Sequence, residues 1–382
     1  MSINKPSIYF VPGFDPVGPP RYAAYFVNTL REVHPPNSIH VQACPSEGGP
    51  SNKRLEWKSF VLTLNKANRS TNIDLCIADY TGVIKDHWNY GYLKILFTSF
   101  NQLVEMFRKK GILLLNKDFR LYYFRLYVLC LFQISWLMPI LLVSVIGTYL
   151  ASFGASFTAA APLLVGIWVL ISWLCYSVLK QFKLVWLLKA LLFEKKLSLP
   201  NDKTLEVAAL TLADQLVCSQ SQKPSGMIYL ISHSSGISLL LLVIFNLQGY
   251  SDLLSKIHVI TYGRALGFPL GNQRIRNSIY SLFNTTTATW MDVTSREDLL
   301  SNSLLSPADY IGADSASIRN LSILDSTPPS STKPQNLFVR LISRLLNQFD
   351  IHMKYLTSRD VGPHAEGSKY YTITELLYKL LT

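Results

Sequence analysis

The sequence predicts an α/β protein: a mostly parallel sheet with helices on both faces, interrupted by a pair of long apolar helices. Short apolar runs typical of buried strands alternate with helical runs along the chain. One of these strands, at residues 228–233, stops at a cluster of small residues, and an apolar helical run follows at once. The apolar pair is predicted from residues 126–179, which contain no Asp, Glu, Lys, Arg or His.

The first segment, residues 1–107, opens with a short strand that runs into the dipeptide Pro12-Gly13. Such a dipeptide is a strong turn signal, and it ends the strand. The pattern of apolar residues further along this segment predicts a helix and two more strands. We expect these elements at residues 7–11 for the first strand, 21–33 for the helix, and 38–43 and 74–78 for the later strands.

The second segment, residues 108–199, is expected to be a membrane insertion. One span needs about 20 apolar residues, so the uncharged run is long enough for two, placed at about residues 126–148 and 162–179. Small residues separate them, and Pro162 can open the second helix. The alternative is a buried helical hairpin of a soluble protein, which the missing charges disfavour.

Basic residues on both sides of the insertion predict its orientation. Lysines and arginines precede and follow the uncharged run, whereas the loop between the two spans carries no charge. Positive residues stay on the cytoplasmic side, so both termini and both parts of the α/β domain are expected in the cytoplasm. Residues 182–193 suit either a helix lying on the membrane surface or an extension of the second span.

The net charge of +12 suggests an anionic partner. Much of the basic excess lies beside the insertion, where lipid headgroups would be, so membrane lipids are the expected partner. No basic recognition helix or nucleic-acid motif is visible, which argues against nucleic-acid binding. The five cysteines are scattered and show no metal-binding spacing, so neither a disulfide framework, a metal nor another cofactor is expected.

The third segment, residues 200–382, starts with a helix expected at residues 202–219 and then reaches the strand at 228–233. Ser234 follows that strand, with Ser232 two residues before it and Gly236 two residues after it. A sharp strand-to-helix turn needs small residues at those places because it brings backbone against backbone. A serine on such a turn presents its hydroxyl above the sheet, so Ser234 is the candidate nucleophile.

This Ser-x-Ser-x-Gly turn resembles the Gly-x-Ser-x-Gly nucleophile elbow of the α/β-hydrolase superfamily, with serine at the first glycine. Residues 10–22 are also similar to the opening of uncharacterised, membrane-inserted bacterial members of that superfamily. The resemblance covers the first and third segments. It implies an oxyanion hole formed by the backbone N–H groups of Phe14 and Ser235.

The resemblance also implies an acid and a histidine, in that order, after the serine. Strands expected at residues 257–263 and 287–291 lead to an acidic loop, where Asp298 is the preferred acid and Asp292 the alternative. Beyond that loop, His352 is preferred and His364 is the alternative. His233 is interpreted as a packing residue.

The expected function is that of a membrane-anchored serine hydrolase with a Ser-His-Asp triad. Its substrate would be an ester or thioester with a hydrophobic acyl group, because a membrane-anchored insertion favours an amphiphile. The resemblance implies a bacterial inner membrane. Two alternatives remain open: an acyltransferase that uses the same acyl-enzyme, and an inactive, membrane-tethered scaffold.

Overall fold

The chain folds into two compact units. The first comprises residues 1–88 and 193–382, and the second comprises residues 89–192. The structure, a computed structural model, describes residues 6–33, 39–43, 55–66, 69–108, 119–154, 156–181, 184–197, 203–222, 224, 226–264, 273–295, 298, 307–308, 318–323, 352–353, 356, 373, 376–377 and 380.

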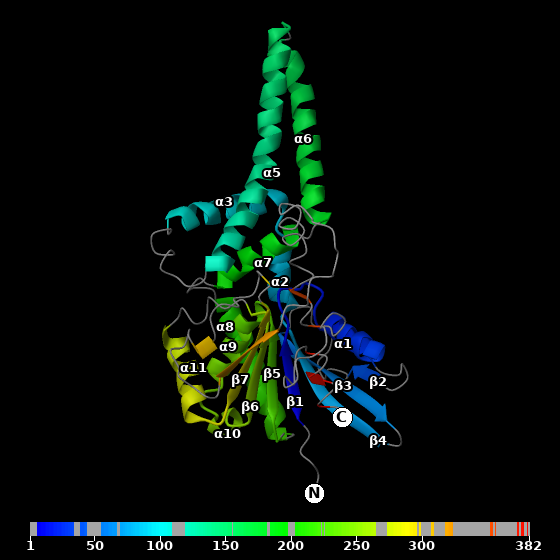
Figure 1. The fold of residues 1–382 in the computed structure, drawn as a ribbon, viewed down its shortest axis with the longest axis vertical. Helices are drawn as coiled ribbons and strands as arrows, with labels where there is room; N and C mark the ends of the chain where they lie inside the picture. Colours follow the sequence, from blue (N-terminus) through cyan, green and yellow to red (C-terminus); the bar gives the residue numbers. More distant parts are fainter. Residues whose placement is uncertain are drawn as a thin grey trace, which may run out of the picture. The chain divides into compact units, whose positions relative to one another are not determined.

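The first unit is built on one eight-stranded sheet, so the predicted α/β class is confirmed (Figure 1). The strands are β1 (Ser7–Val11), β2 (Ile39–Ala43), β3 (Glu56–Lys66), β4 (Arg69–Asp79), β5 (Ile228–His233), β6 (Ile257–Tyr262), β7 (Thr289–Ser295) and β8 (Ile318–Ile323). They lie in the order β2-β3-β4-β1-β5-β6-β7-β8. Every pairing from β4 to β8 is parallel, whereas β2–β3 and β3–β4 are antiparallel.

Strand β1 occupies the middle of this sheet and joins the two parts of the first unit. It pairs with β4 on one side and with β5 on the other. The sequence predicted β1 and the core of β4, but it did not predict β3. Strands β1 and β5 are distant in the chain but lie side by side and parallel at the centre of the sheet, so their C-terminal ends are close together.

Helices connect the strands of the first unit. They are α1 (Pro19–Val33), α2 (Thr81–Trp88), α8 (Lys203–Gln222), α9 (Gly236–Asn246), α10 (Ser251–Leu254) and α11 (Gln273–Thr285). The helices expected at residues 21–33 and 202–219 therefore exist, with slightly wider bounds. Helix α2 was not predicted, and Asp79 caps it by accepting hydrogen bonds from the Thr81 N–H (3.2 Å) and hydroxyl (2.6 Å).

Both faces of the sheet are covered at β1. The side chains of this strand alternate between the two faces, and both sets are buried. Phe10 is buried in the cluster that contains Phe26 of α1 and also Leu376. Its neighbour Tyr9 faces the other way, where its hydroxyl bonds to Ser219 of α8 at 3.2 Å. Since β1 is buried on both faces, its sequence is apolar throughout, as expected for a central parallel strand.

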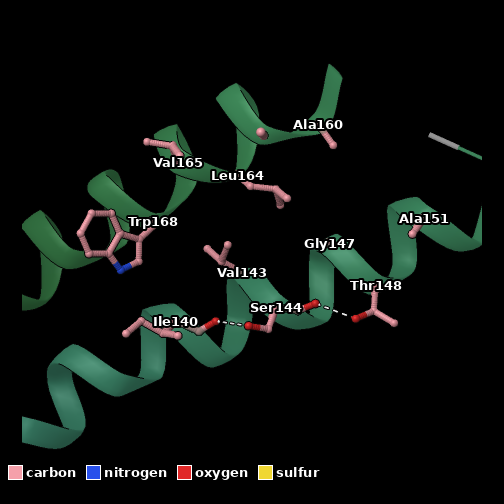
Figure 2. Close-up of a pocket in the computed structure, with 11 residues that line it drawn as sticks. Ile140, Val143, Ser144, Gly147, Thr148, Ala151, Ala160, Leu164, Val165 and Trp168 are labelled. Atoms are coloured by element: carbon pink, nitrogen blue, oxygen red, sulfur yellow. Dashed lines mark hydrogen bonds between the residues drawn. The ribbon is translucent and has the colours of Figure 1, made fainter. Parts of the chain in front are cut away.

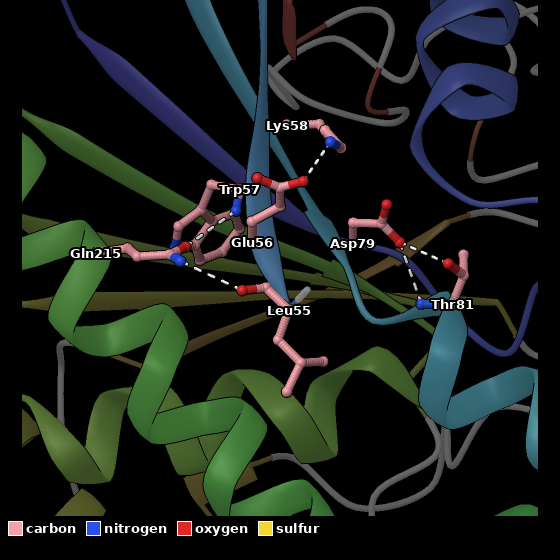
Figure 3. A network of polar contacts seen from close by, with 7 residues as sticks. All are labelled: Leu55, Glu56, Trp57, Lys58, Asp79, Thr81 and Gln215. Carbon is pink, nitrogen blue, oxygen red and sulfur yellow. Dashed lines mark hydrogen bonds and ion pairs between the residues drawn. The ribbon is translucent and has the colours of Figure 1, made fainter. Parts of the chain in front are cut away.

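A polar network fixes the antiparallel edge to α8 (Figure 3). Gln215 accepts a hydrogen bond from the Trp57 N–H (3.1 Å) and donates one to the Leu55 carbonyl (3.2 Å). The Trp57 indole also donates to the Leu212 carbonyl at 2.8 Å. Beside them, Lys58 pairs with Glu56.

The second unit contains α3 (Tyr92–Arg108), α5 (Phe119–Ser152), α6 (Phe157–Gln181) and most of α7 (Leu184–Leu197). Residues 126–152 of α5 and 160–181 of α6 are long and apolar enough to cross a membrane. Helix α6 begins before Pro162, so this proline lies within the helix and does not open it. The unit includes α3, which the sequence assigned to the first segment.

Helices α5 and α6 pack against each other near Gly147. A Cβ atom at that position would lie 3.3 Å from Leu164, so the glycine permits the close approach. A groove of about 670 Å³ runs along this pair, as Figure 2 shows. The hydroxyls of Ser144 and Thr148 bond to carbonyls of their own helix, at 2.9 Å each, which leaves the groove largely apolar.

Helix α7 does not have the exposed apolar face that a surface helix would need. Its large apolar side chains are buried, namely Val185, Leu187, Leu188, Leu191, Leu192 and Phe193. Of the two expectations for residues 182–193, the surface helix therefore does not fit the described part of this segment.

Candidate active site

Ser234 forms the turn between β5 and α9 with a left-handed backbone. Its φ is 55°, and no other non-glycine residue in the described part of the chain has a positive φ. This conformation disfavours a residue with a Cβ atom and costs about 1–3 kcal/mol. The turn is held by a hydrogen bond from the Ser234 N–H to the Tyr262 carbonyl at 3.0 Å. A strained serine at the end of a central strand is the conformation predicted from the sequence.

Two glycines allow the loop after β1 to pass directly over this serine. A Cβ atom on Gly13 would lie 2.9 Å from the Cβ of Ser234 and 3.5 Å from its Oγ. A Cβ atom on Gly236 would lie 2.4 Å from the Pro12 carbonyl oxygen and 2.6 Å from that of Val11. These distances are too short for a side chain, so both positions require glycine.

A buried tyrosine fixes the loop above the serine. The Tyr80 hydroxyl donates to the carbonyl oxygens of Pro12 (2.5 Å) and Gly13 (3.1 Å). Burial, with a contribution from Asp15, raises the pKa of this hydroxyl, so it remains a donor. Asp15 itself accepts a hydrogen bond from the Val17 N–H at 2.9 Å.

The two predicted oxyanion donors, Phe14 and Ser235, directly follow the two residues in close contact, Gly13 and Ser234. Phe14 follows Gly13 directly, and its buried ring packs against Phe193 (centroids 4.9 Å apart) and Trp88 (5.8 Å). Ser235 follows the serine directly and precedes the first residue of α9. Their backbones therefore belong to the two segments that meet at Ser234.

Asp298 and His352 are joined by a short, buried hydrogen bond. The distance from His352 Nδ1 to Asp298 Oδ2 is 2.7 Å, and each residue is only 1% exposed. Because a carboxylate can only accept, Nδ1 carries the hydrogen. In the neutral ring this leaves Nε2 as the basic nitrogen. The sequence-preferred acid and the sequence-preferred histidine thus form a pair.

His233, the residue before Ser234, contacts His352 of this pair. It precedes Ser234 in the chain, and its Nε2 lies 3.1 Å from the backbone oxygen of His352. The two imidazole rings are 4.8 Å apart between centroids. Burial, and secondarily the neighbouring His352, lowers the pKa of His233 to about 3, so its ring is neutral.

Asp292, the alternative acid, is engaged elsewhere. It lies within β7, where its carboxylate pairs with Arg264 (Nε–Oδ2 2.6 Å) and accepts a hydrogen bond from the Thr261 hydroxyl (2.6 Å). Both partners of the ion pair are fully buried. Burial raises the pKa of the Asp292 carboxyl, and the arginine opposes that shift. His364, the alternative histidine, lies outside the described residues.

Sequence reasoning missed three supporting residues. His233 was interpreted only as packing, although its position beside the candidate nucleophile was a usable signal. Tyr80 follows β4 and acts on a loop far away in the chain, and no motif marks it. Helix α11 lies between Arg264 and its partner Asp292 in the chain, so nothing in the local sequence pairs them.

Within the described residues, no group of three or more His, Cys, Asp or Glu side chains could hold a metal ion. Comparisons with protein-family models, with curated proteins and with solved structures find no match for this chain.

Proposed function

We propose that this protein is a membrane-anchored serine hydrolase of the α/β-hydrolase type. The observation that carries the proposal is the buried hydrogen bond between Asp298 and His352 beside the strained Ser234 turn. Nucleophile, acid and histidine occur in the chain order of that superfamily. The order β4-β1-β5-β6-β7-β8, with the serine turn after β5 in its middle, further supports this.

The proposed chemistry assigns one task to each residue. Ser234 Oγ attacks the carbonyl carbon of an ester or thioester, while His352 Nε2 takes the hydroxyl proton. Asp298 holds the Nδ1–H tautomer and stabilises the imidazolium that forms. The N–H groups of Phe14 and Ser235 would stabilise the negative charge on the carbonyl oxygen.

Collapse of this tetrahedral intermediate would expel the alcohol or thiol, which receives the proton from His352. The acyl group is then bonded to Ser234. Water, deprotonated by His352, attacks the acyl-enzyme and releases the carboxylic acid, and the proton returns to Ser234. The serine, the histidine and the acid end each cycle in their starting states.

The membrane location is the second part of the proposal. Helices α5 and α6 have the length and composition of two spans. Basic residues precede and follow them in the sequence, and none lies between them, which favours termini and catalytic unit in the cytoplasm. A hydrolase anchored at a bilayer suits an amphiphilic acyl substrate such as a lysophospholipid, an acylglycerol or a fatty-acyl thioester.

The test is to label the detergent-solubilised full chain with a fluorophosphonate, beside the variants Ser234→Ala, His352→Ala and Asp298→Asn. We expect labelling of the wild type, none of Ser234→Ala, and strongly slowed labelling of the other two. Long-chain and short-chain esters then define the substrate, and release of free acid distinguishes hydrolysis from acyl transfer. Folded wild type that resists labelling and cleaves no ester would contradict the enzyme and favour a scaffold.

A further inference from the structure

Helix α3 exposes a row of large apolar side chains. Leu93, Phe97, Phe100 and Phe107 are 60%, 65%, 52% and 52% exposed, respectively. Their spacings of four, three and seven residues place them on one face of the helix. Burying a large apolar side chain is worth about 1.5–3 kcal/mol, so four of them in water would be costly. An exposed row of this kind marks an interaction surface.

This row is not the surface that attaches α3 to its own unit. Another face of α3 does so, because the Gln133 amide of α5 donates to the Ser99 hydroxyl at 2.8 Å and to the Leu96 carbonyl at 3.4 Å. Ser99 and Ile95, both buried, belong to that attached face. A third face is polar and includes the exposed Lys94 and Asn101. The apolar row therefore remains exposed when the attached face of α3 is packed against α5.

The attachment of α3 to α5 lies next to an exposed apolar stretch of α5. Directly after Gln133, which binds α3, helix α5 exposes Ile134, Leu137 and Met138. Before Gln133, Val128, Leu129 and Phe132 are buried, and Tyr127 is 37% exposed. These residues lie within the membrane-length part of α5. Helix α3 is thus attached at one end of the surface that would face lipid.

The direction of α3 fits a position at the edge of a bilayer. Within the second unit, α3 crosses α5 and does not run alongside it (Figure 1). If α5 crosses the membrane, a helix that crosses α5 at the end of its apolar surface lies along the membrane plane. A helix in that plane buries an apolar face at the boundary of headgroups and acyl chains, with its polar face toward water.

We propose that α3 is an in-plane membrane helix that inserts Leu93, Phe97, Phe100 and Phe107 into the lipid leaflet at the α3 end of the spans. This inference rests on the proposed membrane location but not on the proposed hydrolysis. It assigns the surface-helix role to α3, whereas the sequence offered that role as one of two alternatives for residues 182–193. The occupant is the lipid itself and not a second copy of the chain.

The test measures lipid and water contact at single positions of the full chain. The protein, with its native cysteines replaced, is reconstituted in vesicles of phosphatidylethanolamine and phosphatidylglycerol. Separate variants Phe97→Cys and Phe100→Cys carry an environment-sensitive fluorophore, and Lys94→Cys and Asn101→Cys are matched controls on the polar face. Leu141→Cys and Val169→Cys, at exposed positions of α5 and α6, report whether the spans are in the bilayer.

We expect blue-shifted emission at positions 97 and 100, quenching by nitroxide lipids and weak quenching by iodide. The labels at 94 and 101 should show the opposite. Lipid contact at 141 and 169 without lipid contact at 97 and 100 would overturn the inference and leave the membrane location standing. No lipid contact at any position would overturn both. Protection of 97 and 100 from both quenchers, with cross-links between copies, would overturn it in favour of a self-association surface.

Discussion

The imidazole of His233 donates a hydrogen bond to the backbone carbonyl of His352, over 3.1 Å. A carbonyl oxygen can only accept, so the hydrogen lies on Nε2 of His233. The residue before the candidate nucleophile thereby holds the backbone of the candidate base. His352 is fixed from two directions, since Asp298 holds its ring and His233 holds its main chain.

Replacing His233 should slow the reaction of Ser234 without removing any group that touches the substrate. We expect His233→Ala to lower the rate of fluorophosphonate labelling by about tenfold or more, as for a misplaced catalytic group. His233→Gln keeps an N–H donor and should recover part of the rate. The comparison is made on samples with equal melting temperatures in detergent. Equal rates in both variants would contradict a positioning role.

The neutral state of His233 predicts a loss of stability in acid. Its pKa is about 3 in the folded chain and 6.5 ordinarily, so the unfolded chain takes up the proton first as pH falls. The stabilisation is complete above about pH 6.5 and is lost progressively toward pH 3, by up to roughly 5 kcal/mol. Denaturation of the full chain in detergent at several pH values measures this slope. His233→Gln should have a shallower slope, and an unchanged slope would assign the acid sensitivity to other groups.

The strained backbone of Ser234 predicts a trade between stability and reactivity. Ser234→Gly relieves the positive φ and should raise the free energy of unfolding by about 1 kcal/mol. It should also abolish probe labelling, because the hydroxyl is gone. Ser238→Gly is the control, since it lies inside α9 and should cost about 1 kcal/mol. If both variants lose stability equally, the serine is not strained.

The close contact between α9 and the loop after β1 predicts a large effect of one methyl group. Gly236→Ala would drive its Cβ atom into the carbonyls of Pro12 and Val11, so we expect a loss of about 1–3 kcal/mol, as for overpacking. Gly82→Ala meets no atom within 4 Å and lies in the first turn of α2, so it should be neutral or stabilising. Thermal unfolding of the two variants in detergent provides the comparison. A tolerated alanine at position 236 would mean that the loop can move away.

The two buried aspartates should differ in what they support. Asp292→Asn breaks the fully buried ion pair with Arg264, and breaking a buried pair typically costs about 3–5 kcal/mol. Asp298→Asn should instead reduce the labelling of Ser234 more than it reduces stability, because the His352 tautomer is no longer fixed. Unfolding and labelling are measured on both variants. The reverse pattern would exchange the roles of the two acids.

The sequence predicts those parts of the fold that depend on local patterns. The strand, small-residue turn and apolar helix around Ser234 are contiguous, so the turn could be placed, and the uncharged run predicts two long apolar helices. The described structure pairs Asp298 with His352, the preferred acid with the preferred histidine. Strand β3 was missed because its alternation is broken by polar residues and its partners are antiparallel. The links from His233 to His352 and from Arg264 to Asp292 depend on tertiary proximity, which no local pattern encodes.

The split of the first unit has a consequence for the order of folding. Strand β1 is made first, but its partner β5 follows only after both long apolar helices, and Ser7 pairs with Ile228. One edge of β1 therefore stays unpaired while the intervening helices leave the ribosome, because β5 has not yet been synthesised. The Ser234 turn, which needs the Val11 and Pro12 carbonyls against Gly236, can form only after that delay. If the helices enter the bilayer as they emerge, the site is completed only in chains that are already anchored, and a mature nucleophile would not arise free in the cytosol.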